Sequence, residues 1–173
     1  YRQFDLDQVW FLPNGNPPHK KEENIGTDAR HRSRMVALAI QGRDYCRLEE
    51  YEVRRREVSC SYQTLEHFRK QYPEDEFYFI IGADSLFAIE TWVHPERILA
   101  ACRDDHDSLE EMKAQIGHLK KVYPKARIHL LRSPLIPVSS SEIRRKIRAG
   151  LSIAEEVPGE VEAYIKEEKL YEP

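Results

Sequence analysis

The run Phe77-Tyr78-Phe79-Ile80-Ile81-Gly82-Ala83-Asp84-Ser85 predicts a buried strand that leads directly into a helix. Its apolar residues are typical of a parallel strand covered on both faces, and Gly82 ends the run. Shorter apolar runs at residues 9–12 and 127–131 are also followed by loops, and helical patterns lie between the runs. This alternation predicts an α/β fold, an open, mostly parallel sheet with helices on both faces.

The remaining elements follow from spacing and from residues that begin or end helices. Asp28 is a candidate N-cap, and Pro73 ends a helical pattern. A further strand is predicted at residues 47–53. The predicted helices are residues 29–41, 62–72, 85–92, 96–102, 108–123, 142–149 and 160–169.

Composition limits the function classes. The chain has 173 residues, 27 Lys and Arg against 30 Asp and Glu, and a net charge of −3, which argues against a nucleic-acid binder. A mean hydropathy of −0.68 and the lack of a long apolar run predict no membrane span. Cys46, Cys60 and Cys102 show no metal-ligand spacing, so we expect no metal site and a reducing, cytoplasmic location. We therefore expect one domain over residues 1–173.

The serines before the helix at residues 142–149 form the strongest local pattern. Ser139, Ser140 and Ser141 would stand where a helix begins, and free N–H groups there bind phosphate oxygens. Arg144 lies one turn further on and could contact the same anion. The alternative is ordinary capping by Ser140 or Ser141, with the arginines in solvent. The local sequence leaves both interpretations open.

Two strand ends carry further candidates, each with a structural alternative. Gly82 would let a ligand approach the backbone, and Asp84 could accept hydrogen bonds from a ribose or only cap its helix. Trp92 could stack on a heteroaromatic ring or simply pack in the core.

The loop after residues 9–12 is braced by prolines and holds Asn14, His19 and Lys20. Lys20 could meet a phosphate or belong to a solvated surface. A separate charged run, Glu49, Glu50 and Glu52 with Arg54-Arg55-Arg56, is predicted to be a solvated strand end.

Several stretches together resemble the bacterial nicotinate-nucleotide adenylyltransferases of the nucleotidyltransferase superfamily. They occur in the family's order: residues 9–13 and 14–20, 32–38, 61–65, 79–84 with Trp92, 139–144, and the ending Val157-Pro158, Val161, Tyr164-Ile165, Leu170-Tyr171. The resemblance implies a Rossmann-like fold with C-terminal helices. It also implies transfer of an adenylyl group from ATP to nicotinic acid mononucleotide, with Mg²⁺ and without a covalent enzyme intermediate.

The resemblance also implies roles for single residues. His19, Lys20 and Arg144 would be catalytic. ATP would contact Gly82, Asp84, Arg103, Ser139, Ser140, Ser141, Ile143 and Arg144. The mononucleotide would contact Asn14, His19, Lys20, Thr64 and Trp92. The partners would be these small molecules, with no nucleic acid and no membrane, in a monomer or a homodimer.

Three departures from the family pattern lead to further expectations. The family's leading strand and histidine pair are absent, residues 61–65 are about two residues short, and the stretch from Trp92 to Arg103 looks too short for both a helix and a strand. We therefore expect a chain that lacks its first strand and part of its first helix, with little catalysis of its own and an active parent. The alternatives are an enzyme for another mononucleotide (nicotinamide mononucleotide, phosphopantetheine or flavin mononucleotide) and an inactive nucleotide-binding module.

Overall fold

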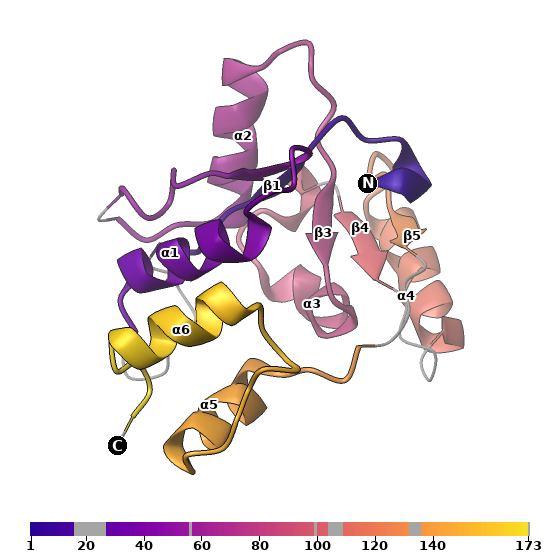
Figure 1. Ribbon diagram of the computed structural model, residues 1–173. Helices are drawn as coiled ribbons and strands as arrows, with labels where there is room; N and C mark the ends of the chain where they lie inside the picture. The colour runs from indigo at the N-terminus through magenta and orange to yellow at the C-terminus, as the bar shows by residue number, and fades with distance from the viewer. Residues whose placement is uncertain (16–26, 56, 99, 104–108, 132–135, 173) are drawn as a thin grey trace. The chain divides into compact units, whose positions relative to one another are not determined.

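The computed structural model describes residues 1–15, 27–55, 57–98, 100–103, 109–131 and 136–172 (Figure 1). Two compact units divide the chain. The first combines residues 1–59 with 137–173, and the second consists of residues 60–136.

The first unit contains a parallel pair of strands, β1 (Val9–Phe11) and β2 (Cys46–Leu48). Val9 stands opposite Cys46 and Phe11 opposite Leu48, and a hydrogen bond from Glu49 N to Phe11 O extends the ladder. Helix α1 (Ala29–Ile40) lies between the two strands in the sequence, as a parallel connection requires. The predicted N-cap is confirmed, because the Asp28 side chain accepts from Arg30 N.

Helices α1, α5 (Ser140–Arg148) and α6 (Gly159–Glu167) enclose the core of the first unit. Figure 1 shows α1 and α6 side by side, and a 2.8 Å hydrogen bond joins His31 Nδ1 of α1 to the Tyr164 hydroxyl of α6. The buried residues of this core are Ile153, Val161, Ile165 and Leu170, and α1 and α5 add Met35, Leu38, Ala39, Ile143 and Ile147.

The second unit contains a parallel sheet in the order β3-β4-β5, formed by Phe79–Ile81, Ala100–Arg103 and His129–Leu131. Its helices are α2 (Ser61–Gln71), α3 (Ala83–Ala88) and α4 (Leu109–Val122). Short 3-10 turns, η3 (Ile89–Thr91) and η4 (Pro95–Arg97), follow α3. A further 3-10 turn, η1 (Arg2–Phe4), belongs to the first unit. The buried core consists of Leu65, Ile81, Leu86, Ile89, Ile98, Met112, Leu119 and Ile128.

The fold class is confirmed, and two predicted elements are wrong. The predicted helix at residues 96–102 is replaced by η4 and by strand β4, which fits into the stretch before Arg103 after all. Pairing with both β3 and β5 favours an extended backbone there over local helix preference. The strand predicted at residues 47–53 ends at Leu48, because its partner β1 ends at Phe11, just before Pro13.

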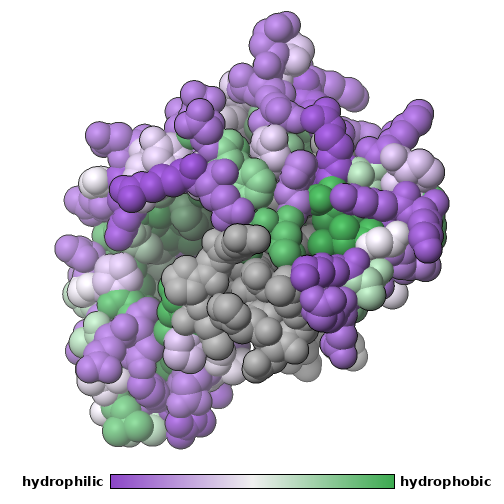
Figure 2. Space-filling view, turned by 90° about the vertical axis from the view of Figure 1, so that its right-hand side faces the viewer, coloured by the Kyte–Doolittle hydropathy of each residue, from purple (hydrophilic) through white to green (hydrophobic). Residues whose placement is uncertain are grey.

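Hydrophilic side chains cover most of the face shown in Figure 2, and a smaller group of hydrophobic ones is exposed on it. Large hydrophobic residues exposed in the two units include Phe11, Tyr45, Ile80, Phe87, Val93, Ile136 and Leu151. In the described ranges, no helix has the length and apolar character needed to cross a membrane.

Candidate functional site

The N-terminus of α5 is capped by Ser139. Its hydroxyl accepts a 3.1 Å hydrogen bond from Glu142 N, and its carbonyl accepts the first helical bond, from Ile143 N. The capping interpretation predicts this role for Ser140 or Ser141, but the cap in the structure is Ser139. Ser140 and Ser141 are exposed, and their backbone N–H groups have no hydrogen-bond partner among the described residues. The helix dipole adds positive potential here, so these groups can bind an anion.

The charges on α5 leave a net positive group near this anion position. Glu142 lies in the first turn, but its carboxylate is paired with Arg145, whose hydrogen bond holds the pKa of Glu142 below its usual range. Arg144 is half-buried and makes no ion pair within the part of the chain that the structure describes. Its guanidinium, one turn into α5, therefore remains for a ligand.

Tyr171 lies close to the same arginine. Burial raises the pKa of its phenol, and the positive charges of Arg144 and Arg32 act against this rise. Tyr171 also packs against the core of the first unit, as Ile143 does. The Ile143 side chain thus anchors α5, and its N–H is bonded to Ser139 O. A contact between Ile143 and ATP stays a prediction.

After the end of β1, hydrogen bonds hold the backbone next to the exposed residue Asn14. Pro13 is buried, Asn14 is exposed, and Gly15 donates from its N–H to Glu52 Oε2 over 3.4 Å. The Arg32 guanidinium donates to Gly15 O over 3.5 Å. His19 and Lys20, predicted to belong to this loop, lie outside the described residues.

At the end of β3, the backbone is open. Gly82 is exposed, and a Cβ atom built on it would meet no heavy atom of the described residues within 4 Å, its chain neighbours aside. Its φ of −79° is accessible to any residue, so the backbone conformation does not require glycine. Asp84 is exposed in the first turn of α3. The predicted approach of a ligand to Gly82 therefore has the space that it needs.

The other candidates of the second unit differ in exposure. Trp92 is half-buried and packs against the core, with its ring 6.3 Å from that of Phe79 in an edge-to-face arrangement. Thr64 is 6 % exposed, beside Leu65 on α2. The backbone of Arg103 ends β4. The structure thus places Thr64, Gly82, Asp84, Trp92 and Arg103 in the second unit, and Asn14, Ser139–Ser141, Ile143 and Arg144 in the first.

Sequence reasoning missed Arg32, Glu52 and Tyr171. Glu52 was expected in a solvated strand end, but it is only 8 % exposed. No residue pattern distinguishes it from its acidic neighbours, whereas Arg32 and Tyr171 do lie in stretches that resemble the family. Among the described residues, no group of three or more His, Cys, Asp or Glu side chains could hold a metal ion.

Comparisons with known proteins place this chain in a class. Residues 1–146 match the family described as cytidylyltransferase-like, and the chain belongs to it. A protein of Lachnoclostridium phytofermentans, named probable nicotinate-nucleotide adenylyltransferase, is 37 % identical over 177 residues, which cover 99 % of this chain and 87 % of the relative. One of Bacillus pumilus with the same name is 38 % identical, over 98 % of this chain and 85 % of the relative. The chain is therefore a member of the nicotinate-nucleotide adenylyltransferase family.

Solved structures share the fold. A Plasmodium falciparum nicotinic acid mononucleotide adenylyltransferase complexed with NaAD has a TM-score of 0.73 and 20 % identity, and the match covers 96 % of this chain and 83 % of that one. The same enzyme complexed with APC has a TM-score of 0.68, 19 % identity and the same coverage.

Proposed function

We propose that this protein transfers the adenylyl group of ATP to nicotinic acid mononucleotide, which yields nicotinic acid adenine dinucleotide and pyrophosphate for NAD biosynthesis. The observation that carries this proposal is the likeness to relatives of that name, at 37 % and 38 % identity over almost the whole chain.

In the proposed reaction, a phosphate oxygen of the mononucleotide attacks the α-phosphorus of ATP in line with the bond to the β-phosphate. The new P–O bond joins the two nucleotides, and the bond to the β-phosphate breaks with its electron pair on pyrophosphate. Such a transfer needs alignment and neutralisation of charge more than an activated side chain. The exposed donors of Ser140 and Ser141 and the cation of Arg144 fit this requirement.

The N-terminus of α5 would hold ATP phosphates. The unpartnered N–H groups of Ser140 and Ser141, together with Arg144, support this role because they supply hydrogen bonds and charge without reorganisation. In the second unit, the space beside Gly82 and the exposed carboxylate of Asp84 support contact with the nucleoside of ATP. Arg103 is a weaker candidate for phosphate contact.

The mononucleotide would contact Asn14, His19, Lys20, Thr64 and Trp92. Exposure of Asn14 and partial exposure of Trp92 support their part in this set, with the indole stacking on the pyridine ring. His19 and Lys20 would serve the phosphate in catalysis, together with Arg144.

Mg²⁺ would arrive bound to ATP. This ion usually keeps several waters and binds substrate phosphates with few protein carboxylates, so it needs no cage of side chains. The donors near α5 fit this arrangement, since Ser140, Ser141 and Arg144 can hold phosphate oxygens that the ion leaves free. We propose a cytoplasmic location, which the free thiols of Cys46 and Cys60 support.

Pyrophosphate release tests the proposal. The purified protein is supplied with ATP and Mg²⁺, and its kcat/KM is measured with nicotinic acid mononucleotide and with its amide analogue. The departures from the family pattern predict little catalysis, whereas the likeness to relatives over almost the whole chain predicts an active enzyme, and we adopt the second expectation. We expect turnover that is faster with the acid, and a loss of about 10²–10³-fold in Arg144→Ala, because one preorganised donor to the transition state is removed. Lys166→Ala is the control, since the Lys166 side chain is 71 % exposed and pairs only within α6, with Glu162, among the described residues.

Two results would contradict the proposal. Turnover that is faster with the amide would assign the other pyridine nucleotide as substrate. Binding of both nucleotides without release of pyrophosphate would assign a binding module.

A further inference from the structure

One backbone residue of the first unit, Gly15, is held by side chains from two distant parts of the sequence. Its N–H donates to the Glu52 carboxylate over 3.4 Å, and its carbonyl accepts from the Arg32 guanidinium over 3.5 Å. Both backbone polar groups of Gly15 are therefore held by charged partners. Glu52 is only 8 % exposed, so the first of these hydrogen bonds is shielded from water.

The packing at Gly15 is close as well as polar. A Cβ atom at position 15 would lie 2.1 Å from the carbonyl oxygen of Glu52, which itself accepts from Arg55 N at 3.2 Å. That oxygen belongs to a hydrogen-bonded turn and cannot move away as a flexible side chain could. Glycine at position 15 and the turn at Glu52 thus form one fitted contact.

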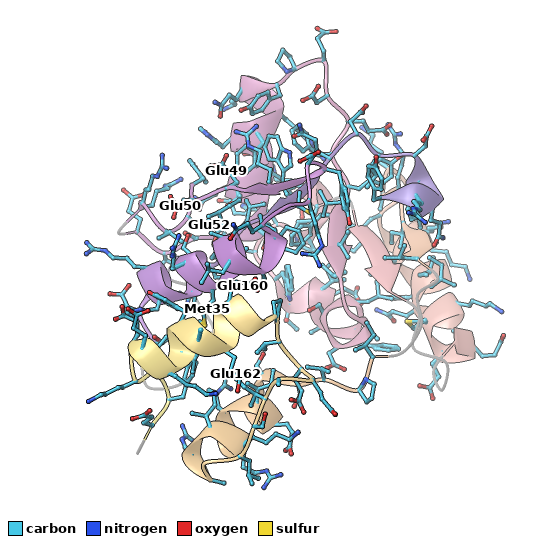
Figure 3. The ribbon with its side chains drawn as sticks, in the orientation of Figure 1. Met35, Glu49, Glu50, Glu52, Glu160 and Glu162 are labelled. Atoms are coloured by element: carbon cyan, nitrogen blue, oxygen red, sulfur yellow. The ribbon has the colours of Figure 1, made fainter. Side chains whose placement is uncertain are left out.

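Glu49 and Glu50, labelled with Glu52 in Figure 3, connect the turn at Glu52 to the strands and to α1. Glu50 accepts from the buried Ser33 hydroxyl of α1 and from Arg54 at 3.1 Å. Glu49 pairs with Arg47 at 3.1 Å, and its N–H extends the ladder to Phe11. The turn that carries Glu52 is therefore itself held in place, and so is the carboxylate that binds Gly15.

Asn14 is the residue that this arrangement positions. It stands between Pro13, which is buried and has a fixed φ, and Gly15, whose peptide groups are both bonded, while its own side chain is exposed. We infer that Glu52 and Arg32 are positioning residues for Asn14, and that they fix its amide for contact with the mononucleotide. This inference rests on the proposed function.

Arg32 fits this role by its own surroundings. Its Nε is buried and has no hydrogen-bond partner among the described residues, so Gly15 O is the acceptor that the structure gives to its guanidinium. Its charge also acts on Tyr171, beside Arg144. Arg32 thus lies close to both candidate groups of the first unit.

Steady-state kinetics of Glu52→Ala, Glu52→Gln and Arg32→Ala test the inference. In Glu52→Ala and Arg32→Ala we expect KM for the mononucleotide to rise about tenfold to a hundredfold, with KM for ATP within about twofold, because Asn14 is misplaced. Glu52→Gln keeps an acceptor for Gly15 N–H and should restore most of the loss. Glu49→Gln is the control, because the Glu49 side chain pairs with Arg47 and its backbone bond to Phe11 is kept in the variant. An unchanged KM for the mononucleotide in Glu52→Ala would overturn the inference.

Hydrogen exchange of the Gly15 amide gives a readout that does not depend on turnover. We expect slow exchange in the wild type and in Glu49→Gln, and exchange at least about tenfold faster in Glu52→Ala. Equal rates in the wild type and Glu52→Ala would overturn the positioning role. If the wild type shows no adenylyl transfer, the proposed function fails, and the exchange rates still decide whether Glu52 holds Gly15.

Discussion

Two glycines follow parallel strands of this protein, and the structure uses them in opposite ways. At Gly15, after β1, the backbone of Glu52 fills the space that a side chain would need, and both peptide groups are bonded. At Gly82, after β3, no heavy atom from the part of the chain that the structure describes lies within 4 Å of that position, apart from its chain neighbours. The first glycine is required by the packing of the protein, whereas the second leaves room for a ligand. A strand-end glycine therefore indicates a binding site only when its surroundings are open.

Gly15→Ala should have the largest effect on stability. The added methyl group meets a carbonyl oxygen held in a turn, so we expect the free energy of unfolding to fall by about 3 kcal/mol, at the upper end of overpacking costs. Chemical denaturation of the variant measures this fall. A loss below about 0.5 kcal/mol would mean that the turn at Glu52 yields easily, and that Gly15 is as replaceable as Gly82.

Gly82→Ala should separate stability from binding. The φ of −79° allows alanine, so we expect the free energy of unfolding to stay within about 0.5 kcal/mol of the wild type. The affinity for ATP, measured by calorimetry, should fall about tenfold, because the methyl group occupies space beside the nucleotide. Unchanged affinity would show that the nucleotide does not approach Gly82.

The serines at the start of α5 show the same contrast between a structural residue and a candidate binding residue. Ser139→Ala removes the N-cap hydrogen bond and should lower stability by about 1 kcal/mol. Ser141→Ala should leave stability nearly unchanged, and any loss should be confined to KM for ATP. Thermal unfolding together with kinetics of both variants decides between these roles. Equal losses of stability would contradict the assignment of Ser139 as the cap.

The smallest expected effect concerns the fall in the free energy of unfolding at acid pH. The hydrogen bond from Ser33, then that from Arg54, holds the pKa of Glu50 below its usual 4.5. Below pH 4.5 the unfolded chain binds more protons at this group than the folded one, so the stabilisation is present above 4.5 and is lost as the pH falls through the folded pKa. Ser33→Ala should make this decline shallower, by less than about 1 kcal/mol, since Glu50 is partly exposed. Identical pH dependence of unfolding in both proteins would contradict the coupling.

The sequence predicts the parts of this fold that depend on local pattern. The apolar run before Gly82 and the N-cap Asp28 were found because strand burial and capping leave residue signatures. The strand β4 was predicted as a helix, since its extended form depends on pairing with β3 and β5. Prediction failed there because the deciding contacts are distant in the sequence.

The candidate site divides in the same way. Ser139–Ser141 and Arg144 form one local motif, and the structure adds only which serine is the cap. The burial of Glu52 and its bond to Gly15 join positions 37 residues apart, and nothing near Glu52 indicates them. The difference between Gly15 and Gly82 cannot be predicted from the sequence either, because it too depends on a contact between distant residues.

The most direct test of the account is a single-turnover reaction of the protein with Mg²⁺, nicotinic acid mononucleotide and ATP labelled in its α-phosphate. Direct adenylyl transfer predicts that the label enters a dinucleotide, while unlabelled pyrophosphate is released and no label becomes attached to the protein. Label found in ADP, in AMP alone or on the protein would contradict adenylyl transfer by direct attack of the mononucleotide.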